Sequence, residues 1–213
     1  MAEIMAPYEY DGRKFEGAVV WDDSVSTPRP MIFMQPDWFG VCRHTIDMAA
    51  EAAGKDYVML VADMYGVGYG ERDKEFDELL ASAQGARHDL PLVREGAAIA
   101  LHELLAGARA QAPVSDSPLG AIGFCMGGGI VLEQARAGAD FAGTVIFHVT
   151  LPNPVEEKAT TDFKGRVLAI HGRADPVTPK EMMDALETEL TTAGVDWQTM
   201  TFGNATHAFC VRG

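Results

Sequence analysis

The feature that most constrains the fold is a run of ten residues in the middle of the chain, GAIGFCMGGG at positions 120–129. Its apolar first half predicts a buried strand that ends at Phe124, and a helix is expected to begin within a few residues. Glycine has no Cβ, so the glycines at this junction allow strand and helix to pack closely. A strand that passes directly into a helix is typical of an α/β sheet.

The rest of the chain repeats this alternation of short apolar runs and longer helical patterns. Near-continuous apolar strands imply burial on both faces, which is usual in parallel sheets. The predicted strands are residues 15–21, 30–35, 57–62, 119–124, 142–147, 167–171 and 197–202, and the predicted helices are residues 43–53, 74–86, 89–110, 126–137 and 179–193. Thr178 is the expected N-cap of the last helix, and Gly194 lies just past its end. We therefore expect a doubly wound, mostly parallel sheet with helices on both faces.

Composition and charge restrict the domain count and the partners. The chain has 213 residues, 47% of them hydrophobic, and a formal net charge of −14, which predicts one soluble α/β domain over residues 1–213. This acidic balance disfavours nucleic acid and anionic membranes as partners. No apolar run reaches the roughly 18 residues of a membrane span, and the N-terminus lacks the apolar core of a signal peptide. Three cysteines, an odd number, indicate free thiols in a reducing, cytoplasmic compartment.

The glycine-rich junction also carries a chemical motif. Gly123 and Gly127 flank Cys125 in the G-x-nucleophile-x-G pattern, which holds a nucleophile on a tight turn between strand and helix. At a helix N-terminus the dipole favours a thiolate, and the backbone N–H of Met126 is free to meet a developing oxyanion. A phosphate-binding loop does not fit, because the glycines match neither GxxxxGKS/T nor GxGxxG. The alternative is a buried cysteine beside glycines that serve only packing.

Two further residues complete a catalytic pattern. Asp175 lies in the loop after the strand predicted to end at His171, and His207 follows the last predicted strand. The order nucleophile, acid, histidine is that of the α/β-hydrolases. All three residues follow carboxyl ends of predicted strands, where open α/β sheets bind their ligands. Cys42 and the histidine two residues after it form only a C-x-H pair, so we expect no metal, and no organic cofactor is implied.

From these residues the chain resembles the dienelactone hydrolase family, the carboxymethylenebutenolidases of the α/β-hydrolase fold. The resemblance covers most of the chain and is carried by GFCMGG at 123–128, VADMYG at 61–66 and HGRADP at 171–176. It implies that Cys125 is the nucleophile, His207 the base and Asp175 the acid that orients the base. The family also has a glutamate that helps to activate the thiol. Asp37 occupies that position here, one methylene shorter, and the backbone N–H of Trp38 would be the second oxyanion donor.

The same resemblance leads us to look for a substrate pocket. Family members that act on dienelactone hold its carboxylate with arginines, one soon after the segment matching VADMYG and one just after the catalytic histidine. In this chain the first arginine after that segment is Arg72, and Arg212 lies one place later than expected. Ligand sites are mostly lined by apolar groups. The expected walls are aromatic residues near the motifs, namely Trp38, Phe39, Tyr65 and Phe209.

The end of the chain departs from the family. Six residues follow His207, where the family usually adds a further helix. The sequence leaves two explanations open: a trimmed product, or a sheet face that is covered in another way, such as by a neighbouring subunit in a homodimer.

The function expected from these residues is hydrolysis of a small ester or lactone through a thioester on Cys125. In a lactone, the leaving alkoxide or enolate stays tethered to the acyl group and can activate water. Two alternatives use the same residues: a thiol-based sensor or binding protein, which reacts without turnover, and an acyltransferase or thioesterase, which needs room for a second acceptor.

Overall fold

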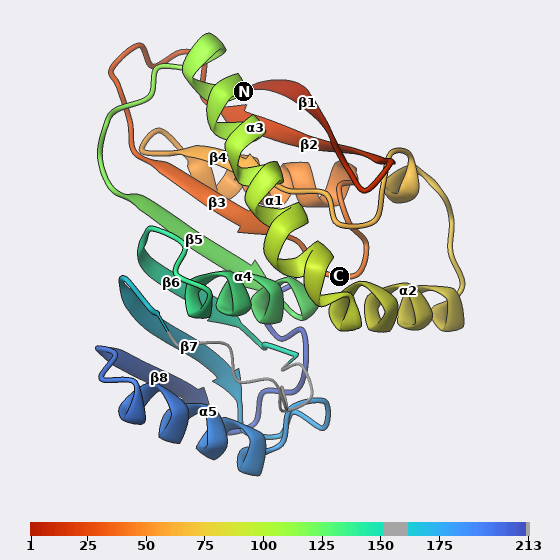
Figure 1. Cartoon of the computed structure of the whole chain (residues 1–213), viewed down its shortest axis with the longest axis vertical. Helices are drawn as coiled ribbons and strands as arrows, with labels where there is room; N and C mark the ends of the chain where they lie inside the picture. Colours follow the sequence, from red (N-terminus) through yellow and green to blue (C-terminus); the bar gives the residue numbers. More distant parts are fainter. Residues whose placement is uncertain (151–161, 212–213) are drawn as a thin grey trace.

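A sheet of eight strands, in the order β1-β2-β4-β3-β5-β6-β7-β8, forms the centre of the molecule (Figure 1). The computed structural model describes residues 1–150 and 162–211. The strands are β1 (Ala2–Tyr10), β2 (Arg13–Trp21), β3 (Met31–Gln35), β4 (Val58–Val61), β5 (Leu119–Phe124), β6 (Phe141–Phe147), β7 (Arg166–Gly172) and β8 (Trp197–Phe202). β1 and β2 pair antiparallel, as do β2 and β4, whereas all pairs from β4 to β8 are parallel. The mostly parallel α/β sheet expected from the sequence is confirmed.

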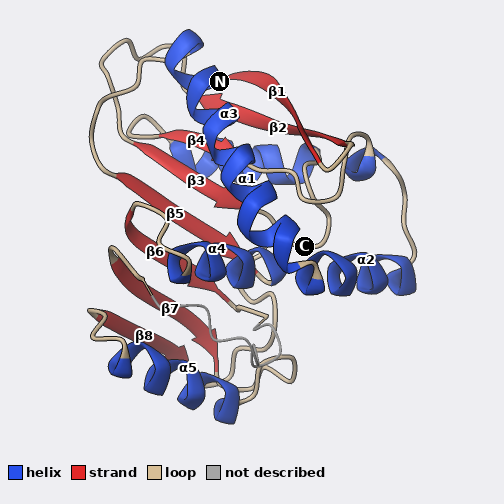
Figure 2. Ribbon diagram, viewed as in Figure 1, coloured by secondary structure: helices blue, strands red, loops and turns tan. Residues whose placement is uncertain are grey.

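Helices lie on both faces of this sheet (Figure 2). They are α1 (Arg43–Ala53), η1 (Tyr69–Glu71), α2 (Phe76–His88), η2 (Leu92–Gly96), α3 (Ala97–Gln111), α4 (Met126–Arg136) and α5 (Lys180–Thr192). On one face, α1 packs its buried residues Ile46, Ala49 and Ala53 on β2 and β4. On the other face, α3, α4 and α5 share one apolar core with the strands. No helix in the described ranges is long and apolar enough to cross a membrane.

Three local predictions need correction. β1 was not predicted, because its alternating polar and apolar residues and Pro7 lack a continuous apolar run. The helix expected over residues 89–110 is present from residue 90 to Gln111 without a break, but it contains η2, a turn of π-helix, before α3. Thr178 does not cap α5, since its hydroxyl donates to the carbonyl of Val149 at 2.6 Å and the N-cap is Pro179. Gly194 follows the helix end with φ +71°, as expected.

On the face of the sheet that α1 occupies, the strands β5–β8 carry apolar side chains that are not fully buried. Strand register places apolar side chains from neighbouring strands, all but one of them half-buried, next to one another on this face. We call them the apolar rows; they comprise Ile122, Val145 and Leu168 in one row and Phe124, Phe147, Ile170 and Met200 in the next. Met200 on the edge strand is 51% exposed. Among the described residues, the helices that pack on β6 and β8 are α4 and α5, on the opposite face.

Candidate active site

Cys125 lies on a strained turn between β5 and α4. Its backbone has φ +53° and ψ −120°, a region that residues with a side chain rarely adopt. A Cβ on Gly123 would lie 2.3 Å from the carbonyl oxygen of Gly127, and one on Gly127 would lie 2.2 Å from that of Pro36. Both flanking positions therefore require glycine, and the start of α4 is packed against the backbone that follows β3.

The parallel strands bring the expected site residues to one edge of the sheet. Asp37 follows β3, Tyr65 follows β4 and Cys125 follows β5. Asp175 and His207 come after β7 and β8. Because the carboxyl ends of parallel strands lie at the same edge, loops far apart in sequence meet there.

Cys125, His207 and Asp175 form one chain of polar contacts. The Sγ of Cys125 is 3.1 Å from Nε2 of His207, and Nδ1 of His207 is 2.8 Å from Oδ2 of Asp175. A carboxylate that accepts from Nδ1–H fixes the imidazole tautomer and leaves Nε2 to interact with the thiol. The hydroxyl oxygen of Thr150 lies 3.4 Å from the same sulfur.

The backbone fixes the acid and the base in this arrangement. Oδ1 of Asp175 accepts hydrogen bonds from the N–H groups of Val177 at 2.8 Å and Thr178 at 3.3 Å, which leaves Oδ2 for His207. A Cβ on Gly172, the last residue of β7, would lie 2.4 Å from the carbonyl oxygen of Ala205. The loop that carries His207 therefore crosses close to the end of β7.

The charge balance around His207 favours its protonated form. Burial alone would lower its pKa, but the hydrogen bond and charge of Cys125, together with those of Asp175, outweigh burial and raise the pKa to about 9. An imidazolium beside a thiol stabilises the thiolate, which is the nucleophilic form of cysteine. This arrangement can supply a reactive sulfur and a proton donor at one place.

The loop after β3 is folded tightly around Asp37. The carboxylate Oδ1 accepts the N–H of Phe39 at 3.0 Å, and the backbone carbonyl of Asp37 accepts the N–H of Gly40 at 3.1 Å. Burial raises the pKa of Asp37, although the hydrogen bond from Phe39 opposes this. In the described part of the chain, the backbone N–H groups of Trp38 and Met126 donate no hydrogen bond.

The expected aromatic residues lie in three settings. Tyr65 is mostly buried and donates its hydroxyl to Sδ of Met126 at 3.1 Å. Phe39 is exposed at the loop surface and contacts the Trp38 ring edge to face. Phe209 packs against His148, with ring centroids 6.0 Å apart. Arg212 lies outside the described residues.

His148, a buried histidine just after β6, lies directly against His207. Their rings are perpendicular, with centroids 4.9 Å apart. Burial, followed by the charge of His207, lowers the pKa of His148 to about 4, so it is neutral at physiological pH. Its Nδ1 is 3.3 Å from Sγ of Cys210, a thiol whose pKa burial raises to about 11. A neutral ring at this position supports His207 without competing for its proton.

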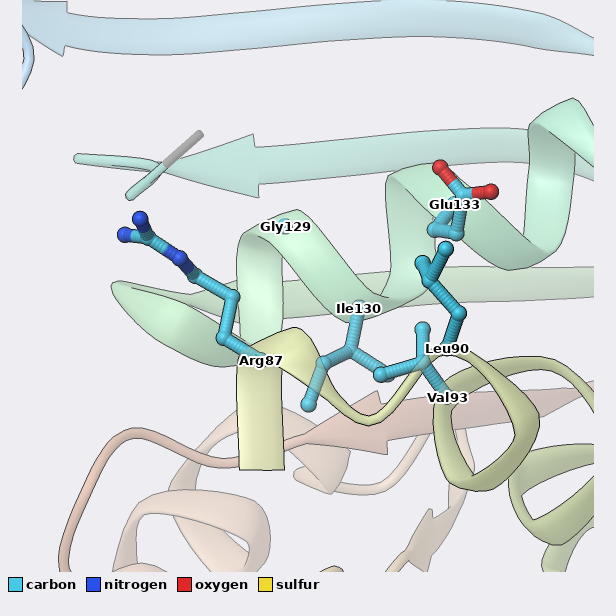
Figure 3. A pocket seen from close by; sticks show the side chains of 6 residues that line it. All are labelled: Arg87, Leu90, Val93, Gly129, Ile130 and Glu133. Atoms are coloured by element: carbon cyan, nitrogen blue, oxygen red, sulfur yellow. The ribbon is translucent and has the colours of Figure 1, made fainter. Parts of the chain in front are cut away.

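Arg87 is a second residue close enough to interact with Cys125 that sequence reasoning missed. It lines a cavity of about 10 Å³ together with Leu90, Val93, Gly129, Ile130 and Glu133. In Figure 3 its guanidinium extends past the first turn of α4, away from the apolar side chains. Burial lowers the pKa of Arg87, whereas the charge of Cys125 raises it, and its Nε is buried without a hydrogen-bond partner. No sequence motif marks this residue, because it comes from the end of α2.

The described residues contain no cluster of three or more side chains suited to a metal ion.

The sequence profile of the dienelactone hydrolase family matches residues 15–213. The chain belongs to the dienelactone hydrolase family. Sequence comparison also finds a provisionally named carboxymethylenebutenolidase from Methylorubrum extorquens, 27% identical over 192 residues. That match includes 85% of this chain but only 64% of the relative, so the chain spans less than two thirds of it.

The structure of this chain is similar to those of other solved proteins. A dienelactone hydrolase-like promiscuous phosphotriesterase from metagenomic libraries is 33% identical and superposes with a TM-score of 0.84, over 98% of this chain and 84% of that one. A provisionally named dienelactone hydrolase from Klebsiella pneumoniae is 20% identical, with a TM-score of 0.70 over 98% of this chain and 89% of that one. The second likeness supports the α/β-hydrolase fold alone.

Proposed function

We propose that this dienelactone hydrolase family member hydrolyses small esters or lactones with Cys125 as nucleophile. The observation that carries the proposal is the continuous contact chain from Cys125 Sγ through His207 to Asp175. A nucleophile within hydrogen-bond reach of a base that is oriented by a third group is the general arrangement of covalent hydrolases. The family match supports the same class of reaction.

In the first half-reaction, the Cys125 thiolate attacks the carbonyl carbon and forms a C–S bond. The carbonyl oxygen becomes an oxyanion, for which the N–H groups of Met126 and Trp38 are the proposed donors. Removal of one such donor costs about 3–4 kcal/mol of transition-state stabilisation in other hydrolases. The C–O bond then breaks, the imidazolium of His207 gives its proton to the leaving alkoxide, and a thioester remains.

In the second half-reaction, water attacks the thioester carbonyl and its proton passes to the imidazole of His207, which the first half-reaction left neutral. The C–S bond breaks, and the carboxylic acid and the Cys125 thiolate are released. Water adds across one ester bond overall, and no oxidant, metal or organic cofactor takes part.

Asp37 is proposed to assist the thiol when substrate is bound. Its Oδ1 is occupied by the N–H of Phe39, and no described residue donates to Oδ2. Burial raises its pKa, which makes the carboxylate a better proton acceptor than an exposed aspartate. Labelling of Cys125 with iodoacetamide checks this role: Asp37→Asn should slow labelling in the presence of a substrate analogue. An equal rate in both proteins would remove Asp37 from thiol activation.

The decisive experiment measures steady-state hydrolysis of p-nitrophenyl acetate. Cys125→Ala should reduce turnover by about 10³-fold or more, because the covalent route is lost. Cys42→Ala, which removes a half-buried thiol outside the contact chain, should retain the wild-type rate. Wild-type turnover in Cys125→Ala would disprove the proposal, and a single burst without turnover would favour a thiol-based sensor.

We also propose phosphotriester hydrolysis as a second activity, on the strength of one observation. The phosphotriesterase from metagenomic libraries is 33% identical over nearly the whole chain. The Cys125 thiolate would attack phosphorus, expel an aryloxide and leave a phosphorylated sulfur for water to cleave. Paraoxon hydrolysis that is lost in Cys125→Ala supports this activity, and no release of p-nitrophenol from paraoxon would contradict it.

The cytoplasmic location, the organisation as one domain and the homodimer remain predictions. A second subunit could cover the apolar rows on β5–β8. Sedimentation of the purified protein checks this: a mass near twice 23.0 kDa supports the dimer, and a mass near 23.0 kDa rejects it.

A further inference from the structure

Two stacked tyrosines lie between the segments that carry the two proposed oxyanion donors. The rings of Tyr65 and Tyr69 are nearly parallel, with centroids 4.1 Å apart and an interplanar angle of 13°. Both rings come from the loop after β4, and Tyr69 begins η1. We refer to Tyr65 and Tyr69 as the tyrosine brace.

Each ring contacts a different side of the site. Tyr65 donates its hydroxyl to Sδ of Met126 at 3.1 Å, at the start of α4. Tyr69 donates its hydroxyl to the backbone carbonyl of Trp38 at 3.1 Å, in the loop after β3. The brace therefore connects the two residues whose backbone N–H groups must converge on one oxyanion.

The peptide between Trp38 and Phe39 is held at both ends. Its carbonyl accepts from Tyr69, and its N–H donates to Oδ1 of Asp37 at 3.0 Å. The preceding peptide, which carries the N–H of Trp38, is held through its carbonyl by the N–H of Gly40 at 3.1 Å. Loss of the Tyr69 hydroxyl would leave the carbonyl of Trp38 without this hydrogen bond and would allow the two peptides to move.

The brace is packed against backbone, which limits its movement. A Cβ on Gly40 would lie 3.0 Å from Cδ2 of Tyr65 and 3.1 Å from Cδ1 of Tyr69. A Cβ on Gly70 would lie 1.9 Å from the carbonyl oxygen of Val41, so η1 rests directly on the loop after β3. Glycine at both positions permits the close approach.

Other groups hold the brace from outside. Asp63 accepts the N–H of Tyr65 at 2.8 Å through Oδ1 and the N–H of Glu16 at 3.1 Å through Oδ2, which ties the loop to β2. The Nζ of Lys74 donates to the carbonyl of Tyr69 at 2.6 Å and lies 4.1 Å from its ring centroid. Burial raises the pKa of Tyr65, so its hydroxyl remains a donor throughout the working pH range.

We infer that Tyr69, acting through the carbonyl of Trp38 and stacked on Tyr65, is a positioning residue that fixes the distance between the two oxyanion donors. The inference rests on the proposed function, because it assigns a role in the stabilisation of an oxyanion. Catalytic donors lose effect when they are displaced by a fraction of an ångström, so a support of this kind contributes to kcat and not to ground-state binding.

The test compares Tyr69→Phe, which keeps the stack and removes the hydroxyl, with Tyr57→Phe as a control. Tyr57 lies just before β4, at the opposite edge of the sheet from Cys125. For p-nitrophenyl acetate we expect Tyr69→Phe to lower kcat by about tenfold and to change KM by less than about twofold. Alkylation of Cys125 by iodoacetamide should be unchanged, because displacement at that carbon develops no oxyanion.

A second measurement does not depend on turnover. Amide hydrogen exchange of residues 37–40 should be faster in Tyr69→Phe than in the wild type, and it should be unchanged in Tyr57→Phe. An unchanged kcat, unchanged exchange, or a parallel fall in alkylation would each overturn the inference. If Cys125→Ala retains wild-type turnover, the proposed function fails and the positioning role fails with it, whereas exchange still shows whether Tyr69 holds the loop.

Discussion

At the scale of single residues, the chemistry of the site depends on the electrostatic interaction between Cys125 and His207. The contact of 3.1 Å between Sγ and Nε2 allows the pair to exist as thiolate and imidazolium. His148 lies against the same imidazole and is neutral, since its pKa is lowered to about 4. The positive charge in this group of side chains is therefore concentrated on His207.

The titration of His207 checks this distribution. We expect a midpoint of about 9 in the wild type and a lower one in Cys125→Ala, where the hydrogen bond and charge of the sulfur are removed. The imidazole proton signals in NMR spectra between pH 6 and 10 report both midpoints. Identical midpoints would contradict the proposed pair.

The raised pKa of His207 also makes the stability of the native state depend on pH. The folded-state pKa exceeds the ordinary value of about 6.5, so protonated His207 stabilises the native state fully below that pH. The contribution is then lost as the pH rises through about 9.

The glycines around Cys125 give a second prediction at this scale. Gly123→Ala should lower the free energy of unfolding by about 1–3 kcal/mol, because the new methyl group would meet the Gly127 carbonyl at 2.3 Å. Gly120→Ala on the same strand is the control, since its Cβ would lie 3.7 Å from Ile32, an ordinary contact. Urea denaturation of the two variants compares them, and equal losses would count against a steric requirement at Gly123.

At the scale of elements, buried charge connects η2, α4 and α5. Glu133 on α4 pairs with Arg94 at 2.7 Å and with Arg136, and Arg136 also pairs with Glu189 on α5 at 2.6 Å. The carboxylate of Glu133 is 1% exposed, so its loss leaves positive charge in a poorly hydrated place.

Glu133→Gln should therefore destabilise the protein by about 3 kcal/mol or more. Asp184→Asn, which breaks the exposed pair between Lys180 and Asp184 on α5, should cost less than about 1 kcal/mol. Equilibrium unfolding in urea at pH 7 measures both. A loss in Glu133→Gln as small as in the control would show that the network is not needed for stability.

Some of the elements can be predicted from the sequence and others cannot, for physical reasons. The continuous apolar strands from β3 to β7 were identified because burial on both faces removes polar residues from them. β1 is an edge strand with one exposed face, and its mixed composition hides it. The π-helical turn of η2 could not be foreseen, because a residue composition typical of a helix does not specify which carbonyl each N–H selects.

The residues of the site also differ in whether they can be predicted from the sequence. Cys125, Asp175 and His207 are marked by motifs and by their position after strands, and the structure brings Cys125 and Asp175 each within hydrogen-bond distance of His207. Arg87 and Tyr69 approach the site through tertiary packing, with no local pattern to mark them.

At the scale of the whole molecule, the apolar rows place half-buried apolar side chains beside the exposed Met200 on one face of the sheet. A contiguous apolar face attracts dyes and other proteins. Met200→Lys places a charge on the exposed end of one row and should lower the fluorescence of bound anilinonaphthalene sulfonate. Met5→Lys is a matched control on β1, where the side chain is 45% exposed. An equal decrease in both variants would mean that the dye does not bind the rows.

The sheet order also decides which part of the site is lost first on heating. His207 follows β8, whose one strand neighbour in the described part of the chain is β7 and whose side chains are largely exposed. Edge elements with few buried contacts open at a lower free energy than the core. The enzyme should therefore have a working temperature limit set by β8: its rate should decline reversibly with temperature below the calorimetric melting point, while the central strands and Cys125 remain folded.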